Sequence, residues 1–168
     1  MRVHLVDGTY ELFRQFYGRP GHLNGDGMEV GATRAVLRNM LAMLDDGATH
    51  LGVATDSVVE SFRNELYDGY KSSEGMDAEI LAQFPLLDRG LFALGVATFA
   101  MVEYEADDAL GAAAAVAAAD PRVSQVLICT PDKDLAQCVQ GDRVVQYDRR
   151  KDVVVDEAGV IEKFGVSP

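Results

Sequence analysis

Acidic side chains follow four short apolar segments of the chain, at or just beyond the point where each segment ends. The set is Asp7 after 3–6, Asp56 after 51–54, Glu105, Asp107 and Asp108 after 96–101, and Asp132 and Asp134 after 126–129. Any one of these acids could be a helix N-cap or a first-turn residue. Seven carboxylates that meet at one place, however, repel one another unless cations neutralise them or their pKa values rise.

A divalent metal ion is the simplest partner for such a set. All seven side chains are hard oxygen donors without a histidine or cysteine among them, which favours Mg²⁺, with Mn²⁺ as a substitute, over zinc or copper. Two ions about 3.5–4 Å apart stabilise the attacking and leaving oxygens of a phosphoryl displacement. The acids therefore predict a two-metal phosphodiesterase.

A phosphodiester substrate also needs cations from the protein, because acids alone repel it. Arg63 and Lys71 follow the loop after Asp56, and Arg14 lies on the helix expected after Asp7. Tyr67 and Tyr70, in the same segment as Lys71, could stack on bases or simply pack. These cations could equally form surface ion pairs or remain solvated, so they are candidate phosphate-binding residues. The three histidines are expected to be structural or exposed.

The apolar pattern indicates how the acids are positioned. Strands are predicted at 3–6, 51–54, 96–100, 126–129 and 144–146. Spacings of three and four between apolar residues predict helices at 12–16, 36–44, 80–94, 105–119 and 156–164, and polar breaks at 18–27 and 68–75 predict loops. Strands that alternate with helices and are too apolar to expose a face predict a doubly wound, mainly parallel α/β sheet with helices on both faces. Ligand sites of such sheets lie beyond the carboxyl ends of the strands, where the acids fall.

Composition restricts the remaining possibilities. The 168 residues carry 15 Lys and Arg against 27 Asp and Glu, a net charge of −12, and suit one domain. Such acidity argues against a general nucleic-acid binder. Neither a membrane span nor a signal peptide is expected, so we expect a cytoplasmic protein. Cys129 and Cys138 are expected to be reduced, partly buried thiols.

Four stretches together resemble the 5′ to 3′ exonuclease and flap endonuclease family, whose bacterial members include the N-terminal domain of DNA polymerase I and free-standing paralogues. They are Val6-Asp7-Gly8, Phe62-Arg63 through Tyr70-Lys71, Tyr104-Glu105-Ala106-Asp107-Asp108, and Thr130-Pro131-Asp132-Lys133-Asp134-Leu135. The resemblance covers nearly the whole chain. It implies a PIN-like fold, two divalent metals, and hydrolysis of DNA phosphodiesters where single-stranded 5′ ends or flaps meet duplex.

The resemblance also implies roles for individual residues. Asp7, Asp56, Glu105, Asp107 and Asp108 resemble the ligands of a first metal, and Asp132 and Asp134 resemble part of a second site. Lys71 resembles the lysine beneath an arch that admits the single strand, and Arg63 resembles a basic position there. We expect Lys71, Asp7 and Asp108 to be the catalytic residues, and Arg14, Arg63 and Lys71 to bind DNA phosphates.

Two departures from the family pattern are visible. Relatives often have an arginine where this chain has Glu74, so a second cation of the arch is replaced by an acid. Relatives also continue into a helix-hairpin-helix segment that grips duplex DNA and adds an aspartate to the second metal. We therefore expect residues 1–168 to be one catalytic domain that ends before that segment and lacks most of the basic surface for duplex DNA.

Three other functions remain to be separated from this one. A PIN-type endoribonuclease shares the fold and the acids but lacks the segment from Phe62 to Lys71. A phosphoacceptor signalling module places an acidic pair directly after its first strand, whereas Gly8 follows Asp7 here. A metal-binding but inactive fragment that docks on a partner is the third possibility.

Overall fold

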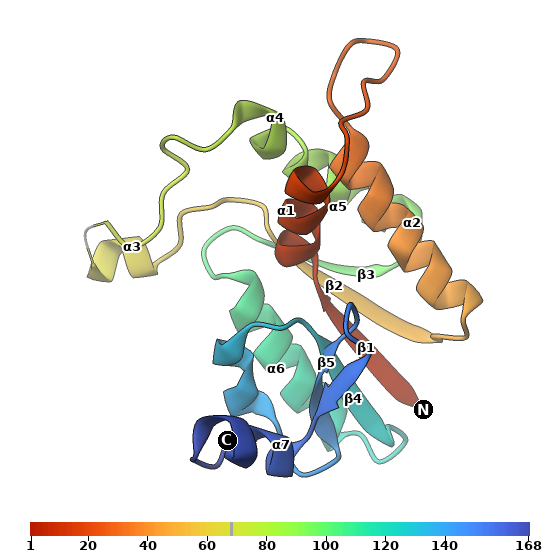
Figure 1. Cartoon of the computed structure of the whole chain (residues 1–168), viewed down its shortest axis with the longest axis vertical. Helices are drawn as coiled ribbons and strands as arrows, with labels where there is room; N and C mark the ends of the chain where they lie inside the picture. Colours follow the sequence, from red (N-terminus) through yellow and green to blue (C-terminus); the bar gives the residue numbers. More distant parts are fainter. Residues whose placement is uncertain (68) are drawn as a thin grey trace.

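A six-stranded sheet forms the centre of the computed structural model, which describes residues 1–67 and 69–168 (Figure 1). The strands are β1 (Arg2–Asp7), β2 (His50–Asp56), β3 (Ala97–Met101), β4 (Gln125–Cys129), β5 (Val144–Asp148) and β6 (Val153–Val155), in the order β3-β2-β1-β4-β5-β6. All neighbouring strands are parallel except the last pair, β5 and β6, which is antiparallel. The predicted mainly parallel sheet is therefore confirmed.

Helices cover both faces of this sheet. They are α1 (Gly8–Gly18), α2 (Gly31–Asp45), α3 (Arg63–Leu66), α4 (Ala78–Leu81), α5 (Phe84–Ala93), α6 (Ala106–Ala119), the 3₁₀ helix η1 (Lys133–Cys138) and α7 (Glu157–Phe164). One core packs α1, α2, α4 and α5 against side chains such as Val6 and Val53. The other packs α6 and η1 against the alternate residues, such as Leu5 and Ala54. Because both faces of the sheet are buried, its strands are apolar throughout rather than alternating.

The register brings the carboxyl ends of the inner strands together. Asp7 lies opposite Ala54 of β2, and Asp56 lies opposite Met101 of β3. At Gly8, where β1 turns into α1, an added Cβ would approach the carbonyl oxygen of Ala54 to 2.8 Å. Glycine therefore permits the close contact between the two strand ends and keeps Asp7 next to Asp56.

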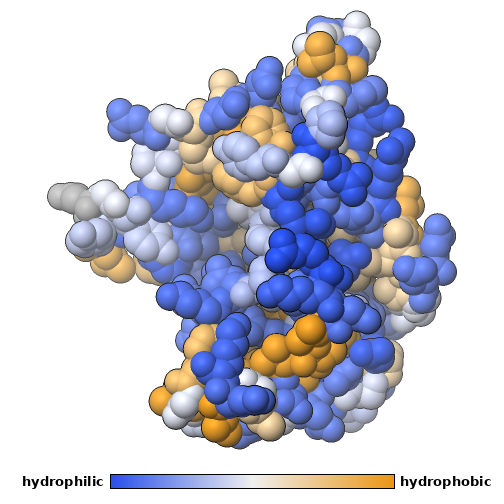
Figure 2. All heavy atoms as spheres, viewed as in Figure 1, coloured by the Kyte–Doolittle hydropathy of each residue, from blue (hydrophilic) through white to orange (hydrophobic). Residues whose placement is uncertain are grey.

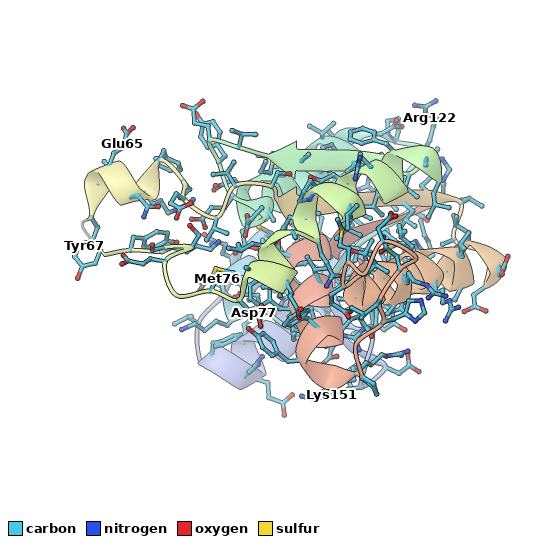
Figure 3. The ribbon with its side chains drawn as sticks, turned by 90° about the horizontal axis from the view of Figure 1, so that it is seen from above. Glu65, Tyr67, Met76, Asp77, Arg122 and Lys151 are labelled. Carbon is cyan, nitrogen blue, oxygen red and sulfur yellow. The ribbon has the colours of Figure 1, made fainter. Side chains whose placement is uncertain are left out.

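Residues 57–67 and 69–77 extend from the end of β2 as an arm that carries α3 away from the sheet (Figure 1). Seen from above, Glu65 and Tyr67 lie at the far end of this arm (Figure 3). The base of the arm is fixed by the backbone, since the N–H groups of Val58 and Phe62 donate to the carbonyls of Met101 and Glu103. The arm and the start of α6 are therefore held side by side.

The structure differs from the sequence predictions at one helix and one strand, and one predicted loop residue lies outside the described part of the chain. The single helix predicted at 80–94 is two helices, α4 and α5, with Pro85 in the first turn of α5. Proline lacks the N–H that a continuing helix requires, so the chain restarts there. Strand β6 was not predicted, because three consecutive valines show no alternation. Asp68, the first residue of the predicted loop 68–75, lies outside the described residues.

Other predictions agree with the structure. The helix predicted at 156–164 is α7, with Asp156 as its N-cap. Both cysteines are free thiols, Cys129 buried and Cys138 half-buried. Across the described part of the chain, no helix combines the length and hydropathy needed to cross a bilayer.

Candidate active site

The seven predicted acids line two adjoining cavities at the carboxyl edge of the sheet. The first cavity, of about 280 Å³, is lined by Asp7, Asp56, Glu105, Asp107 and Asp132, together with Lys71. The second, of about 380 Å³, shares Glu105 and Asp107 with the first and adds Asp108, Asp134, Arg63 and Tyr70. Four separate strand ends therefore deliver their carboxylates to one place. We call this set of seven side chains the acid cluster.

Asp7 lies deepest in the acid cluster. It ends β1 and caps α1, where its Oδ1 accepts from the Tyr10 N–H at 2.8 Å, while its Oδ2 accepts from the Thr130 hydroxyl at 3.1 Å. Burial raises the pKa of Asp7 to about 6, and the charges of Asp56 and Asp132 add to this rise. The Asp7 carboxylate thus caps α1, and its ionised form is destabilised by burial and by the neighbouring acids.

Asp56 joins the acid cluster to the arm. Its Oδ1 accepts from the N–H of Ala106, at the beginning of α6, at 2.7 Å, and its Oδ2 accepts from Lys71 Nζ at 2.8 Å. Burial alone would lower the pKa of Lys71, but the hydrogen bond and charge of Asp56 outweigh it, and the net shift is upward. The ammonium therefore stays charged inside the cavity. It neutralises one acid of the cluster.

Glu105 and Asp108 form a capping box at the start of α6. The Glu105 side chain accepts from the Asp108 N–H, and the Asp108 side chain accepts from the Glu105 N–H. Glu105 also accepts from the Ser61 hydroxyl at 2.7 Å and from the Tyr70 hydroxyl at 3.3 Å. Arg63 binds both oxygens of Asp108 at 2.8 Å. This bidentate hydrogen bond lowers the pKa of Asp108 and raises that of Arg63.

Asp107, Asp132 and Asp134 are the least restrained acids of the cluster. Burial, followed by the charges of Asp7 and Asp132, raises the pKa of Asp107 to about 7. Asp132 caps η1 by accepting from the N–H of Asp134 at 2.9 Å, and both of these acids are exposed. Asp134 lines the second cavity rather than the first.

The acid cluster has the donor chemistry of a site for hard divalent cations. Its ligands are carboxylate oxygens, and two of them have pKa values raised by burial and mutual repulsion, which bound cations would relieve. Among residues 1–67 and 69–168, however, no three acidic, histidine or cysteine side chains form a ready-made metal-binding group. Asp56 and Asp108 are instead paired with Lys71 and Arg63.

Arg14 lies apart from the acid cluster. Its guanidinium pairs with Glu11 on the same helix and lines a neighbouring cavity with Thr130 and Pro131. Sequence reasoning did not single out Ser61, Thr130 or Asp88, whose hydroxyl and carboxyl groups hold the acids in place. No local pattern marks such partners, since Asp88 reaches Thr55 across 33 positions of the sequence.

Comparison with known proteins identifies the family of this chain. Residues 2–165 match the family model described as the 5′-3′ exonuclease N-terminal resolvase-like domain. The chain is 33% identical over 174 residues to DNA polymerase I of Rhizobium leguminosarum, covering 98% of this chain and 17% of that protein. It is 34% identical over 176 residues to the enzyme of Mycobacterium leprae, covering 98% of this chain and 19% of that protein. The chain thus spans about a fifth of the length of these relatives.

Solved structures share the fold. The bacteriophage T5 D15 protein co-crystallised with metal ions aligns with a TM-score of 0.72 at 14% identity, over 99% of this chain and 61% of that one. The T5 D15 flap endonuclease, in a complex with DNA and metal ions, aligns with a TM-score of 0.68 at 18% identity, over 99% of this chain and 61% of that one. With the family model matched along residues 2–165, the chain belongs to the family of N-terminal resolvase-like domains of 5′–3′ exonucleases.

Proposed function

We propose that this chain is a structure-selective 5′ nuclease that hydrolyses DNA phosphodiester bonds with two Mg²⁺ ions, as a 5′ to 3′ exonuclease and 5′-flap endonuclease. The observation that carries the proposal is the acid cluster itself. Acids from four strand ends line adjoining cavities, and Lys71 reaches into the first of them from the arm. Family membership and the DNA and metal ions named for a T5 relative support the same function.

In this proposal the first cavity holds the metal ions. Asp7, Asp56, Glu105, Asp107 and Asp132 supply the oxygens there, and Asp108 and Asp134 extend the donor set into the second cavity. Bound divalent cations supply Lewis-acid stabilisation of the charge that develops on the phosphoryl oxygens, and Mn²⁺ can substitute for Mg²⁺.

Lys71 acts on the substrate in this proposal. Its ammonium is charged and half-buried, and it hydrogen-bonds Asp56 from within the cavity. If Asp56 held a cation, the Lys71 ammonium would be free to donate to an oxygen of the scissile phosphate. A fixed donor aimed at developing charge contributes about 10² to 10³ in rate. Arg63 is the second cation at the base of the arm.

The arm supports a substrate with a single-stranded 5′ end. It carries Leu66, Tyr67 and Tyr70 with 76%, 68% and 44% of their surface exposed, which is unusual for such side chains. Exposed aromatic rings such as that of Tyr67 can stack on unpaired bases, whereas paired bases are already stacked. The arm thus favours unpaired DNA over duplex.

The proposal is tested by incubating residues 1–168 with a labelled duplex bearing a single-stranded 5′ tail, in Mg²⁺, in Mn²⁺ and in EDTA. We expect cleavage near the junction in either metal and none in EDTA. Asp7→Ala should abolish cleavage and weaken Mn²⁺ binding. Asp45→Asn, a substitution at an exposed acid at the end of α2, is the matched control and should change neither.

The same assay separates the alternatives. A matched RNA that is cleaved faster than the DNA would replace the proposal with an endoribonuclease. Mn²⁺ binding that is lost in Asp7→Ala, without any cleavage by the unsubstituted chain, would identify a metal-binding docking module.

A further inference from the structure

Two further cavities adjoin one another on the sheet face beside α1, outside the acid cluster. The first, of about 520 Å³, is lined by Arg2, His4, Tyr147 and Arg149, with Asp46 and other residues after α2. The second, of about 140 Å³, is lined by Tyr10, Arg14, Tyr147, Arg149 and Arg150, with Glu11 and Asp148. Tyr147 and Arg149 belong to both, so the two cavities form one groove, which we call the α1 groove.

Cations gather at the α1 groove in a chain whose net charge is −12. Arg149, Arg150 and Lys151 are the only consecutive basic residues of the sequence, and they form the turn between β5 and β6. Figure 2 shows strongly hydrophilic side chains where this turn approaches α1, and Figure 3 shows Lys151 at the margin of the molecule on that side. The turn thus concentrates positive charge at one place.

Two of the three acids that line the α1 groove are paired with cations, whereas Asp46 is exposed and forms no ion pair with the described residues. Glu11 is 3% exposed and pairs with Arg14, and Arg149 Nη1 lies 4.0 Å from its Oε1. Asp148 pairs with Lys151 at 3.6 Å. Arg2 and Arg150 are exposed, and neither forms an ion pair with any residue that the structure describes. These two cations remain available to an anion.

Two buried nitrogens in the α1 groove also lack partners. His4 Nδ1 and Arg14 Nε are shielded from solvent and have no hydrogen-bond partner within residues 1–67 and 69–168. Buried polar atoms in proteins are rarely left unpaired. Because both atoms are shielded from solvent, they indicate a polar interior beneath the α1 groove, whereas the exposed Arg2 and Arg150 provide the charges that phosphate oxygens can reach.

The α1 groove is continuous with the acid cluster. Tyr10 lines both the smaller cavity of the groove and the first cavity of the cluster. Thr130, which also lines the groove, donates to Asp7 at 3.1 Å. A polymer that occupies the acid cluster would therefore pass Tyr10 to enter the groove.

We infer that the α1 groove binds the phosphate backbone of a nucleic-acid strand that continues from the acid cluster. Arg14, Arg149 and Arg150 line the smaller cavity, which shares Tyr10 with the cluster, and Arg2 and His4 line the larger cavity beyond it. This inference rests on the proposed nuclease function and adds a second contact region to it. The cations compensate locally for a net negative charge that would otherwise repel DNA.

The test compares two doubly substituted chains of equal net charge. Arg2→Gln with Arg150→Gln removes the two unpaired cations of the α1 groove. Arg38→Gln with Arg89→Gln removes two exposed cations on α2 and α5 that line neither cavity of the groove. None of the four side chains forms an ion pair with the described residues, so melting temperatures should remain close to that of the unsubstituted chain.

Binding is measured by fluorescence anisotropy with a labelled single-stranded DNA in Ca²⁺ across a range of KCl concentrations. We expect the groove variant to bind more weakly and to reduce the slope of log K against log salt by about 1.4, since each phosphate contact contributes about 0.7 on single strands. The control variant should match the unsubstituted chain. Equal slopes for the two variants, or no binding by the unsubstituted chain, would overturn the inference.

Two more measurements complete the test. Titration with inorganic phosphate and with strands of increasing length distinguishes a backbone track from an isolated phosphate site. Affinity that does not increase with length would overturn the inference. Hydrolysis of bis(p-nitrophenyl) phosphate by the unsubstituted chain in Mn²⁺ reports on the acid cluster alone. Its absence, with groove-dependent DNA binding retained, would count against the proposed nuclease and not against the groove.

Discussion

Individual carboxylates in this chain serve two purposes at once. Asp7 and Asp132 each cap a helix, and Glu105 and Asp108 form a capping box, yet all of them line the cavities of the acid cluster. The two roles are compatible because a cap engages one carboxylate oxygen while the second can face other groups of the site, as Asp7 Oδ2 faces the Thr130 hydroxyl. Helix α1 begins directly after β1, and α6 and η1 begin a few residues after β3 and β4, so these caps fall at the edge of the sheet where the cluster lies.

Sequence alone could predict which acids converge but not what holds them. Parallel strands end at one edge of a sheet, so Asp7 and Asp56 follow from their positions in the chain. The pairing of Lys71 with Asp56, and of Arg63 with Asp108, depends on how the arm folds back, and no local spacing encodes that. These contacts turn two predicted phosphate-binding residues into partners of predicted metal ligands.

Replacing Lys71 by Ala should separate metal binding from cleavage. Turnover of the 5′-tailed DNA should fall about 10² or more, because a positioned donor is lost. Mn²⁺ affinity should hold or increase, because Asp56 no longer pairs with an ammonium. Isothermal titration calorimetry and product release measure the two effects. Lys163→Ala, on the exposed face of α7, is the control, and unchanged turnover in Lys71→Ala would remove this lysine from the mechanism.

The stability of the metal-free chain should depend on pH through Asp7 and Asp107. Their pKa values rise from 3.8 to about 6 and about 7 on folding, so the folded chain binds their protons more tightly than the unfolded chain. Their contribution to the free energy of unfolding is complete at low pH and is lost as pH rises through these values. In EDTA, the contribution of Asp7 and Asp107 should therefore lower the melting temperature from pH 5.5 to pH 7.5.

Asp107→Asn isolates the contribution of Asp107 to this pH dependence. The difference in melting temperature between the variant and the unsubstituted chain removes the effects of groups that both chains share. His4 is one such group, and its lowered pKa changes stability in the opposite direction. The variant should be the more stable chain in EDTA at pH 7.5 and should gain less from Mn²⁺. The unsubstituted chain should gain about 2.7 kcal/mol when Mn²⁺ is present at about 100 times its dissociation constant. A variant that shows the same pH dependence as the unsubstituted chain would contradict the assignment to Asp107.

At the scale of elements, the sheet and its helices were predictable because burial on both faces leaves a clear apolar signal. The order of strands and helices agrees with the sequence from β1 to α7, apart from α3, η1 and β6, which were not predicted, and the break before α5. Short elements were missed for a common reason. Helix α3 has four residues and β6 has three, and such lengths carry no periodicity. Their positions depend on tertiary contacts.

Helix α5 positions the end of β2 through one buried carboxylate. Asp88 accepts from the hydroxyls of Thr55 and Ser57, both at 2.6 Å, and these two residues flank Asp56. Asp88→Ala should lower the free energy of unfolding by about 1–3 kcal/mol, because it leaves two hydroxyl groups without their acceptor. Urea unfolding measures this loss. Asp77→Ala, which removes only the exposed cap of α4, should cost less, and equal losses would show that Asp88 has no special role.

At the scale of the whole molecule, charge is distributed unevenly. The acid cluster occupies the carboxyl edge of the sheet, and the α1 groove places cations beside it, within a net charge of −12. The net charge argued against a general nucleic-acid binder. A net charge is a sum over the whole chain, however, and cannot show where the cations gather. The pairing of β5 with β6 creates the turn that carries Arg149–Lys151, and this pairing was not predicted from the sequence.

The same distribution predicts how fast the chain meets DNA. Two bound divalent ions would change the net charge from −12 to −8, because each adds two positive charges, and they would do so where the scissile phosphate binds. Association in Ca²⁺ should therefore be faster than in EDTA at equal ionic strength, since long-range repulsion between like charges slows encounter. Stopped-flow fluorescence with labelled 5′-tailed DNA measures the rate.

Asp7→Asn with Asp107→Asn should associate faster than the unsubstituted chain in EDTA and respond less to Ca²⁺, because two charges of the acid cluster are already removed. A Ca²⁺ response of equal size in both chains would assign the acceleration to screening of the DNA itself rather than to cations held by the cluster.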